Sequence, residues 1–294
     1  MFKSVRVKTL PLVICTILNA VLVIAAANIR STQPSHSPVA AEIRKDTSIE
    51  VPIIMYHAVS DVSFIQGDYV ISSSEFESDL KYLKDKGYTT VFISELVDYV
   101  NGDGEIPKKP IAITFDDGYY NNYLYVYPLL KKYNVNASIS PVAYYSDLYT
   151  KSGEVSECYS HCTWNQLKEM GESGYVELGN HSYNCHSYNG SQNGLGQKYG
   201  ESDSDYKKRI SDDITTAQDM IFENTGITCS FIAYPFGVYN DNTEEIVKKL
   251  GFNAALTCSS GINQIEKGDT ETLYELKRLI RPHNSGLEYI LSKY

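Results

Sequence analysis

The sequence has few basic residues for its length. Its 294 residues include 26 lysines and arginines against 36 aspartates and glutamates, which gives a formal net charge of −10. The basic residues form no stripe along the chain. Because binding to nucleic acid depends on neutralising phosphates with Lys and Arg, we expect no nucleic-acid partner.

Phosphate-binding glycine loops and a regular cysteine pattern are also missing. No glycine-rich loop follows any predicted strand, which argues against a dinucleotide site. The six cysteines do not have a spacing that fixes a disulfide framework. Cys229 and Cys258 each fall in or beside a predicted strand, and both a bridge between them and two free thiols are compatible with the sequence.

One long hydrophobic run occupies residues 10–27. This run, LPLVICTILNAVLVIAAA, carries no charge and follows Lys3, Arg6 and Lys8. Its length is at the lower limit for a membrane span and exceeds the usual apolar core of a signal peptide. We therefore favour a signal anchor over residues 1–29, with its basic end in the cytoplasm. The alternative is a signal peptide that is cleaved near the alanines at 25–27.

Both alternatives place the rest of the chain outside the cytoplasm, either anchored to the membrane or secreted. Residues 30–50 are polar and contain several serines and prolines, which is typical of a linker. A catalytic domain is then expected over residues 51–294. The hydrophobic content of 43% is sufficient for a full core. We expect this domain to be a monomer.

From residue 51 onward one unit recurs, an amphipathic helix that ends at a glycine and leads into a short β-rich run. In SSEFESDLKYLKDKGYTTVF, Ser74 and Glu77 form a predicted capping box and Gly87 ends the helix. Helices that alternate with strands predict parallel pairing in an α/β fold. About seven strands, near the number of a distorted (β/α) barrel, are expected at VPIIMYH, TTVFI, PIAITFDD, NASISPV, YVELGNH, SFIAYPFG and NAALTC.

Several predicted strands end in groups that can react. These groups are His57, the pair Asp116–Asp117, the pair His181–His186 and the turn at Pro235–Gly237. In a parallel barrel the carboxyl ends of all strands share one face, and active sites are built on that face. We therefore expect these residues to meet, although the chain separates them by more than a hundred positions.

The two histidines are candidates for metal ligands. His181 and His186 are five positions apart, so neither a helix nor a strand would direct both to one ligand, whereas a loop could. Two imidazoles and one carboxylate form a three-ligand shell for zinc or another divalent ion, with positions open for water and substrate. One of the two aspartates would bind the ion and the other would accept a proton from water. The alternative is a pair of surface histidines in a polar loop.

Four segments, in this order, carry a resemblance to a known family: VPIIMYHAV, KPIAITFDDGY, ELGNHSYNCHS and FIAYPFGVYN. Residues 51 to about 290 are similar to polysaccharide deacetylases of the NodB-homology type (carbohydrate esterase family 4). Within this family, the five-residue histidine spacing resembles the poly-β-1,6-N-acetylglucosamine deacetylases. The resemblance implies a metal-dependent hydrolase that removes N-acetyl groups from N-acetylhexosamine residues of an extracellular or cell-wall polysaccharide.

The resemblance also implies roles for individual residues. Asp116 resembles the general base, and Asp117 resembles the metal-binding carboxylate. His181 and His186 resemble the two metal-binding histidines, and Zn²⁺ is the expected ion. The backbone N–H of Phe236 resembles the donor that stabilises the oxyanion.

The sequence departs from the wider family at two points. An arginine that braces the base is replaced by Ala233, so the sequence does not show what orients Asp116. A leucine-x-histidine motif near the C-terminus is also missing. His57 in the first predicted strand, where the similar branch has its acid, is therefore the preferred general acid, and His283 is the second candidate. For His57, a structural histidine in the core or at its rim is the alternative.

Two other functions are compatible with these departures. One is an O-acetyl esterase that acts on a decorated glycan, because ester and amide hydrolysis both need the oxyanion to be stabilised. The other is a non-catalytic glycan-binding protein of the cell wall, which would not need an oriented base.

Overall fold

The computed structural model describes residues 48–186 and 194–294. The chain divides into a unit of residues 1–35 and a unit of residues 36–294, and every described residue belongs to the second unit. The predicted signal anchor or signal peptide and most of the predicted linker lie outside the described residues. Within the described ranges, none of the helices has the length and apolar character needed to cross a bilayer.

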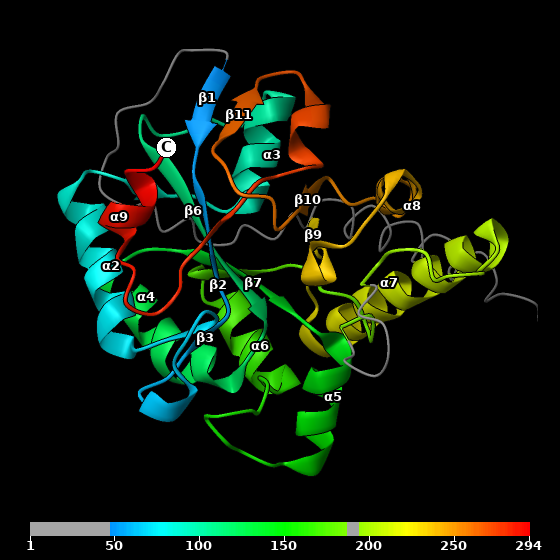
Figure 1. The fold of residues 1–294 in the computed structure, drawn as a ribbon, viewed down its shortest axis with the longest axis horizontal. Coiled ribbons are helices and arrows are strands. Elements are labelled where there is room, and N and C mark those ends of the chain that lie inside the picture. The colour runs from blue at the N-terminus through cyan, green and yellow to red at the C-terminus, as the bar shows by residue number, and fades with distance from the viewer. Residues whose placement is uncertain (1–47, 187–193) are drawn as a thin grey trace, which may run out of the picture. The chain divides into compact units, whose positions relative to one another are not determined.

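In the described part of the chain, seven parallel strands pair into a closed ring. Helices lie around these strands (Figure 1). Two isolated parallel bridges, Asn180 with Ile232 and Leu256 with Leu276, join the separate sheets into this ring. The predicted α/β barrel of about seven parallel strands is therefore confirmed. In order around the ring the strands are β2 (Ile53–Tyr56), β6 (Pro110–Asp117), β7 (Ala137–Pro141), β8 (Val176–Leu178), β9 (Phe231–Ala233), β10 (Ala254–Leu256) and β12 (Leu279–Ile280).

One of the predicted strands does not belong to the ring. The run TTVFI forms only β5 (Thr89–Thr90), which pairs with the beginning of β6. The chain then enters helix α3 (Ile93–Asn101), whose first N–H groups contact the carboxylate of Glu177. The seventh strand of the ring is β12 instead. With only two residues, β12 is too short for a β-rich pattern to indicate it.

The first predicted strand is divided at Pro52, which has no N–H group to donate within a sheet. Val51, the one residue of the predicted strand before the proline, joins residues 48–50 of the predicted linker in β1 (Ser48–Val51), which pairs antiparallel with β11 (Asn263–Glu266) outside the ring. The residues after the proline form β2. Beyond the carboxyl end of β2, the strands β3 (Ala58–Val59) and β4 (Val70–Ile71) form a small parallel pair of their own.

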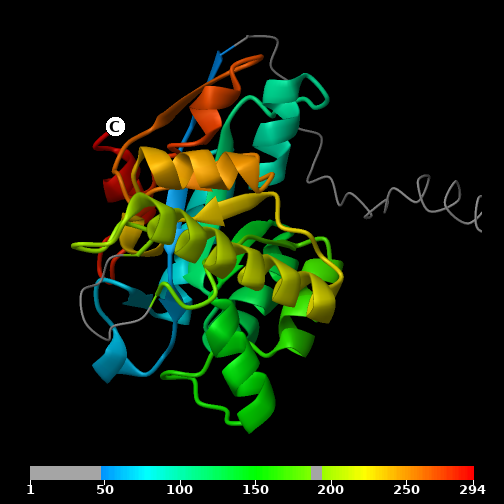
Figure 2. The same cartoon turned by 90° about the vertical axis from the view of Figure 1, so that its right-hand side faces the viewer.

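Helices cover the outside of the ring, and Figure 2 shows α7 and α8 side by side along one flank. The spacing of Ile210, Ile214, Ala217 and Ile221 predicts the buried face of α7, and all four are fully buried. Besides α3, the α-helices among the described residues are α2 (Ser73–Asp85), α4 (Tyr127–Tyr133), α5 (Ala143–Ser152), α6 (Trp164–Glu172), α7 (Asp203–Thr225), α8 (Asp241–Lys249) and α9 (Leu287–Leu291).

The capping box of α2 lies two residues earlier than the sequence predicts. The Ser72 hydroxyl accepts a hydrogen bond from the Glu75 N–H at 3.2 Å, and the Glu75 carboxylate accepts one from the Ser72 N–H at 2.9 Å. Ser74 is already inside the first turn. Both serines fit the capping pattern locally, so which of them caps α2 depends on where the chain leaves β4.

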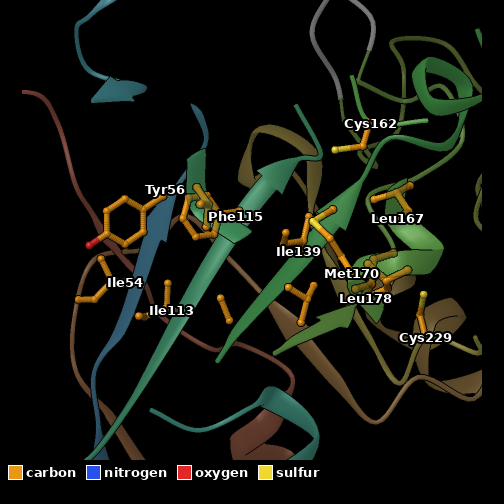
Figure 3. Packing of buried hydrophobic residues seen from close by; sticks show 14 of the residues in the cluster. Ile54, Tyr56, Ile113, Phe115, Ile139, Cys162, Leu167, Met170, Leu178 and Cys229 are labelled. Carbon is orange, nitrogen blue, oxygen red and sulfur yellow. The ribbon is translucent and has the colours of Figure 1, made fainter. Parts of the chain in front are cut away.

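Alternation along β6 divides its side chains between the hydrophobic core and the barrel interior. Ile113 and Phe115 face outward in one buried cluster with Ile139 of β7 and Leu178 of β8. Figure 3 shows Phe115 beside Tyr56, whereas Leu178 lies near Leu167 and Met170 of α6. The intervening residues point the other way, because neighbouring side chains of a strand lie on opposite faces. The register that buries Phe115 under the helices therefore turns Asp116 into the barrel.

A buried ion pair holds the C-terminal segment to α2. Arg281, directly after β12, donates through Nε to Oδ2 of Asp79 at 2.8 Å, and both side chains are at most 3% exposed. The Tyr56 hydroxyl donates to the same carboxylate oxygen at 3.1 Å. These contacts fix the end of β12 and thereby the strand that completes the ring.

We expect Asp79→Ala to lower the free energy of unfolding by roughly 3 kcal/mol, because it leaves the buried guanidinium of Arg281 without its closest carboxylate. Urea unfolding followed by circular dichroism measures this loss. Glu77→Ala, on the same helix, removes only contacts with exposed lysines and Tyr133 and should have a much smaller effect. Equal losses in the two variants would contradict the role of the buried pair.

Candidate active site

A cavity of about 630 Å³ opens at the carboxyl ends of the ring strands. Residues at or next to six of the seven ring strands line it, as a parallel barrel predicts. All the residues that the sequence analysis placed in the site lie on its wall except His283. They are His57, Asp116, Asp117, His181, His186 and Phe236.

The Asp-Asp-Gly turn at the end of β6 directs two neighbouring acids into this one cavity. In a regular strand they would point to opposite faces, but Asp117 has a left-handed backbone with a φ of 69°. Gly118 follows with a φ of 69°, and a Cβ there would lie only 2.7 Å from the Cβ of Pro141. Only glycine fits this position, so the sequence DDG has a steric basis as well as a chemical one.

Arg278, which the sequence analysis did not identify, holds Asp116 in place. Its Nη1 and Nη2 donate to Oδ1 and Oδ2 of Asp116, both at 2.7 Å, and its side chain is fully buried. Its Nε donates to the carbonyl oxygen of Thr257 at 2.8 Å. Burial raises the pKa of Asp116, but the charge and hydrogen bonds of Arg278, together with the charges of His181 and His57, outweigh burial and lower the pKa to about 2. Asp116 is therefore ionised and fixed in orientation.

Arg278 braces the base in place of the family arginine that is replaced here by Ala233. Ala233 lies on β9, whereas Arg278 reaches the same carboxylate from the segment before β12, on a different part of the ring. The signal in the sequence is weak, since it consists of one arginine next to the apolar pair of β12. Only the closure of the ring shows that this arginine faces the barrel interior.

Asp117, His181 and His186 form a cluster of three buried donors, with one ligand atom from each within 4.8 Å of the others. The Nε2 atoms of His186 and His181 lie 3.2 Å and 3.5 Å from Oδ1 of Asp117. Ligand atoms around a tetrahedral zinc ion, with bonds of ~2.0–2.1 Å, lie about 3.3 Å apart. The cluster therefore has the dimensions of a divalent metal site.

The hydrogen bonds around the cluster also fit a cation. Nδ1 of His181 lies 2.8 Å from the carbonyl oxygen of Ala233, which can only accept, so Nδ1 carries a proton. When His181 is neutral, the lone pair of its Nε2 therefore faces Asp117. Oδ1 of Asp117 is buried and has no hydrogen-bond partner among the described residues. A cation between these atoms would end the repulsion between the Nε2 lone pair and the carboxylate of Asp117. It would also give the buried Oδ1 a partner.

His57 and Phe236 complete the wall of the cavity. His57 follows β2 and packs edge-on against Tyr69, with the ring centroids 4.8 Å apart. Burial lowers the pKa of His57, although the charges of Asp116 and Asp117 oppose this effect. Phe236 lies in the turn Pro235–Gly237 after β9 with a φ of 57°, and its ring stacks on His186 at 4.2 Å.

Two other predictions from the sequence concerned His283 as an acid and a bridge between Cys229 and Cys258. Nδ1 of His283 lies 2.7 Å from Oε2 of Glu75 at the start of α2, and His283 is not among the residues that line the cavity. The structure therefore gives no support to His283 as the acid. Cys229 is buried, Cys258 lies on the cavity wall, and both are free thiols, so no disulfide joins them.

A parallel (β/α) barrel with a braced carboxylate and three metal-type donors at its strand ends defines a candidate hydrolase site. The family to which the chain belongs follows from comparison with known proteins. Residues 103–255 match the family model described as polysaccharide deacetylase, and the chain belongs to this family. This match confirms the family and the deacetylase activity expected from the four sequence segments.

Three known proteins illustrate the similarity. The putative polysaccharide deacetylase YxkH of Bacillus subtilis (strain 168) is 29% identical over 86% of this chain and 80% of its own length. The poly-beta-1,6-N-acetyl-D-glucosamine N-deacetylase of Escherichia coli (strain K12) is 27% identical over 80% of this chain, which spans only 37% of that protein. The solved structure of a de-N-acetylase from Aggregatibacter actinomycetemcomitans has a TM-score of 0.71 and 26% identity, and covers 84% of this chain and 100% of that chain.

We expect the full chain to bind one divalent ion and Asp117→Asn to weaken that binding by more than roughly 100-fold, because loss of a ligand exceeds the 10–100-fold effect of an outer-shell change. Titration calorimetry with zinc measures the affinity. Asp147→Asn, which alters a surface pair with Lys151 on α5, is the control and should bind as the wild type does. Unchanged binding in Asp117→Asn would exclude this cluster as the site.

Proposed function

We propose that this polysaccharide deacetylase depends on a divalent metal and acts on β-1,6-linked N-acetylglucosamine polymers outside the cell. The observation that carries the metal dependence is the cluster of three donors beside a carboxylate that Arg278 keeps ionised. The choice of polymer is supported by the printed activity of the Escherichia coli relative and by the five-residue spacing of the two histidines.

Asp117, His181 and His186 would hold the ion, and their mixture of nitrogen and oxygen donors favours Zn²⁺. A bound ion would polarise the acetyl carbonyl and lower the pKa of a water molecule from 15.7 to about 7. This help is needed because Asp116, with a pKa of about 2, is a weak base towards ordinary water. The strength of Asp116 as a base is low, but its position and its charge are fixed.

Each remaining step is assigned to a residue on the cavity wall. Asp116 accepts the proton of the attacking water. The backbone N–H of Phe236 donates to the oxyanion that develops on the acetyl carbonyl. His57 donates a proton to the leaving nitrogen, because an amine leaves far more readily once it is protonated. The products are acetate and a free amino sugar in the polymer.

Arg278 bears on the non-catalytic alternative. A glycan-binding protein without activity was compatible with the sequence because nothing in it oriented the base. The bidentate contact of Arg278 with Asp116 removes that argument. The O-acetyl esterase alternative shares the same cavity and is distinguished by its substrate.

We also propose an extracytoplasmic location for this activity. The basic residues and the apolar run within residues 1–29 support a signal anchor, with a cleaved signal peptide as the alternative. The polar residues 30–50 would then link the membrane to a monomeric catalytic domain. This arrangement brings the cavity to a polymer outside the cell.

Zinc-loaded protein is expected to release acetate from a β-1,6-linked N-acetylglucosamine oligomer, and dialysis against a chelator should reduce the rate at least about 100-fold. Acetate is measured by a coupled enzymatic assay. Restoring zinc should restore the rate, which separates removal of the metal from denaturation. Full activity after complete removal of the metal would reject the metal-dependent mechanism. Turnover of O-acetylated glycans alone would favour the esterase.

Arg278→Lys is expected to lower kcat about 10- to 100-fold with little change in KM. A lysine cannot bind both oxygens of Asp116, and a small displacement of the base lowers the reaction rate strongly. Steady-state kinetics on the same oligomer measure the effect. Arg281→Lys is the matched control, since it weakens a similar buried pair three residues away and outside the cavity. A comparable loss of kcat in both variants would show that Arg278 acts only through stability.

A further inference from the structure

The loop that carries both histidines has an unusual set of contacts. It begins after β8 and bends so that His181 and His186, on either side of four residues, reach the same aspartate. Ser182 takes a left-handed backbone with a φ of 70°, which is unfavourable for a residue with a side chain. A loop of this shape needs contacts from other parts of the protein to keep its conformation.

Asp213 of α7 provides the first of these contacts. Its Oδ1 accepts a hydrogen bond from the N–H of Tyr183 at 2.8 Å, and its Oδ2 accepts one from the N–H of Asn184 at 3.0 Å. These two residues lie between the histidines. Hydrogen bonds to an ionised acceptor are about twice as strong as neutral ones. The carboxylate therefore binds the middle of the loop, some thirty positions away in the chain.

The opposite side of the loop is bound by α5. The N–H groups of Ala143 and Tyr144, in the first turn of this helix, donate to the carbonyl oxygens of Ser182 and Tyr183 at 3.2 Å and 3.1 Å. The loop backbone thus donates to α7 and accepts from α5. A shift of the loop away from either helix would therefore break hydrogen bonds.

The helix that carries Asp213 is itself anchored in the core. Ile210, Ile214 and Ala217 of α7 are fully buried. The side-chain amide of Asn180, just before His181, donates to the carbonyl oxygen of Ile214 at 3.2 Å. Asp213 therefore holds the loop at a fixed place relative to the buried helix α7. It is not among the residues that line the cavity.

We propose that Asp213 is a positioning residue for metal binding, which sets the distance between His181 and His186 without touching the ion. This inference rests on the metal site of the proposed function and adds a residue to it. Without the carboxylate, two N–H groups lose their acceptors and the strained bend at Ser182 can relax. His186 would then move away from Asp117, and the affinity for the ion would fall.

The neighbouring residue on α7 supplies a matched control. Asp212 has the same chemistry, but its side chain is 63% exposed and its partner is Lys208 one turn along the helix. Asp213→Asn places an N–H₂ group against one of the loop N–H groups, whereas Asp212→Asn changes only the surface. The two variants have the same charge and the same composition.

The test compares full-length wild type, Asp213→Asn and Asp212→Asn for zinc affinity by calorimetry and for the visible spectrum of the cobalt-substituted protein. We expect Asp213→Asn to lower zinc affinity about 10- to 100-fold, as for other residues that orient ligands. Its cobalt spectrum should also change in shape, because the coordination geometry changes. Amide exchange of metal-free Asp213→Asn should be faster at Tyr183 and Asn184 and unchanged in β6.

The outcomes separate this inference from the proposed function. If wild type and Asp213→Asn bind zinc equally with the same cobalt spectrum, Asp213 has no positioning role and the metal site stands. If wild type binds no divalent ion, the metal site is wrong and this inference falls with it. Should Asp213→Asn fail to fold, Asp213→Glu keeps the charge but displaces the acceptor by one methylene. About a tenfold loss of affinity is then expected, and unchanged affinity overturns the role.

Discussion

Two carboxylates side by side in a buried cavity are the constraint on which this site depends. Each would be costly to hold ionised without a positive partner. Arg278 neutralises Asp116 through two hydrogen bonds of 2.7 Å, and it does so from the segment just before β12, the last strand of the ring. Asp117 faces two histidines, and its buried Oδ1 has no hydrogen-bond partner within the described part of the chain, which fits a cation. The two acids therefore obtain their partners from separate parts of the chain.

The closure of the barrel brings Arg278 to Asp116. β12 has only two residues, yet it completes the ring beside β2 and places Arg278 over the end of β6. The ion pair of Arg281 with Asp79 fixes the other end of this short strand against α2. Stability and chemistry are thus coupled through one segment: the same few residues close the ring, brace the base and attach the C-terminal part of the chain.

Local patterns in the sequence were enough for part of this picture. The alternation of helices and β-rich runs indicates a parallel barrel, because periodicity depends only on neighbours along the chain. The turn at Asp116–Gly118 and the spacing of His181 and His186 point to the acids and the ligands. The same reasoning misplaced the cap of α2 and took residues 89–93 for a ring strand. Each error concerns a choice between locally equivalent options.

The sequence by itself therefore determined the repeating fold, the strand ends that carry reactive groups and the identity of the metal-type donors. Only the tertiary structure decided which side chains orient them. Arg278 and Asp116 are 162 positions apart, and Asp213 lies 30 positions from Tyr183. No local pattern encodes such pairs, because a contact between distant residues exists only once the ring has closed and its helices have packed. Closure, a property of the whole chain, fixes the geometry of the site.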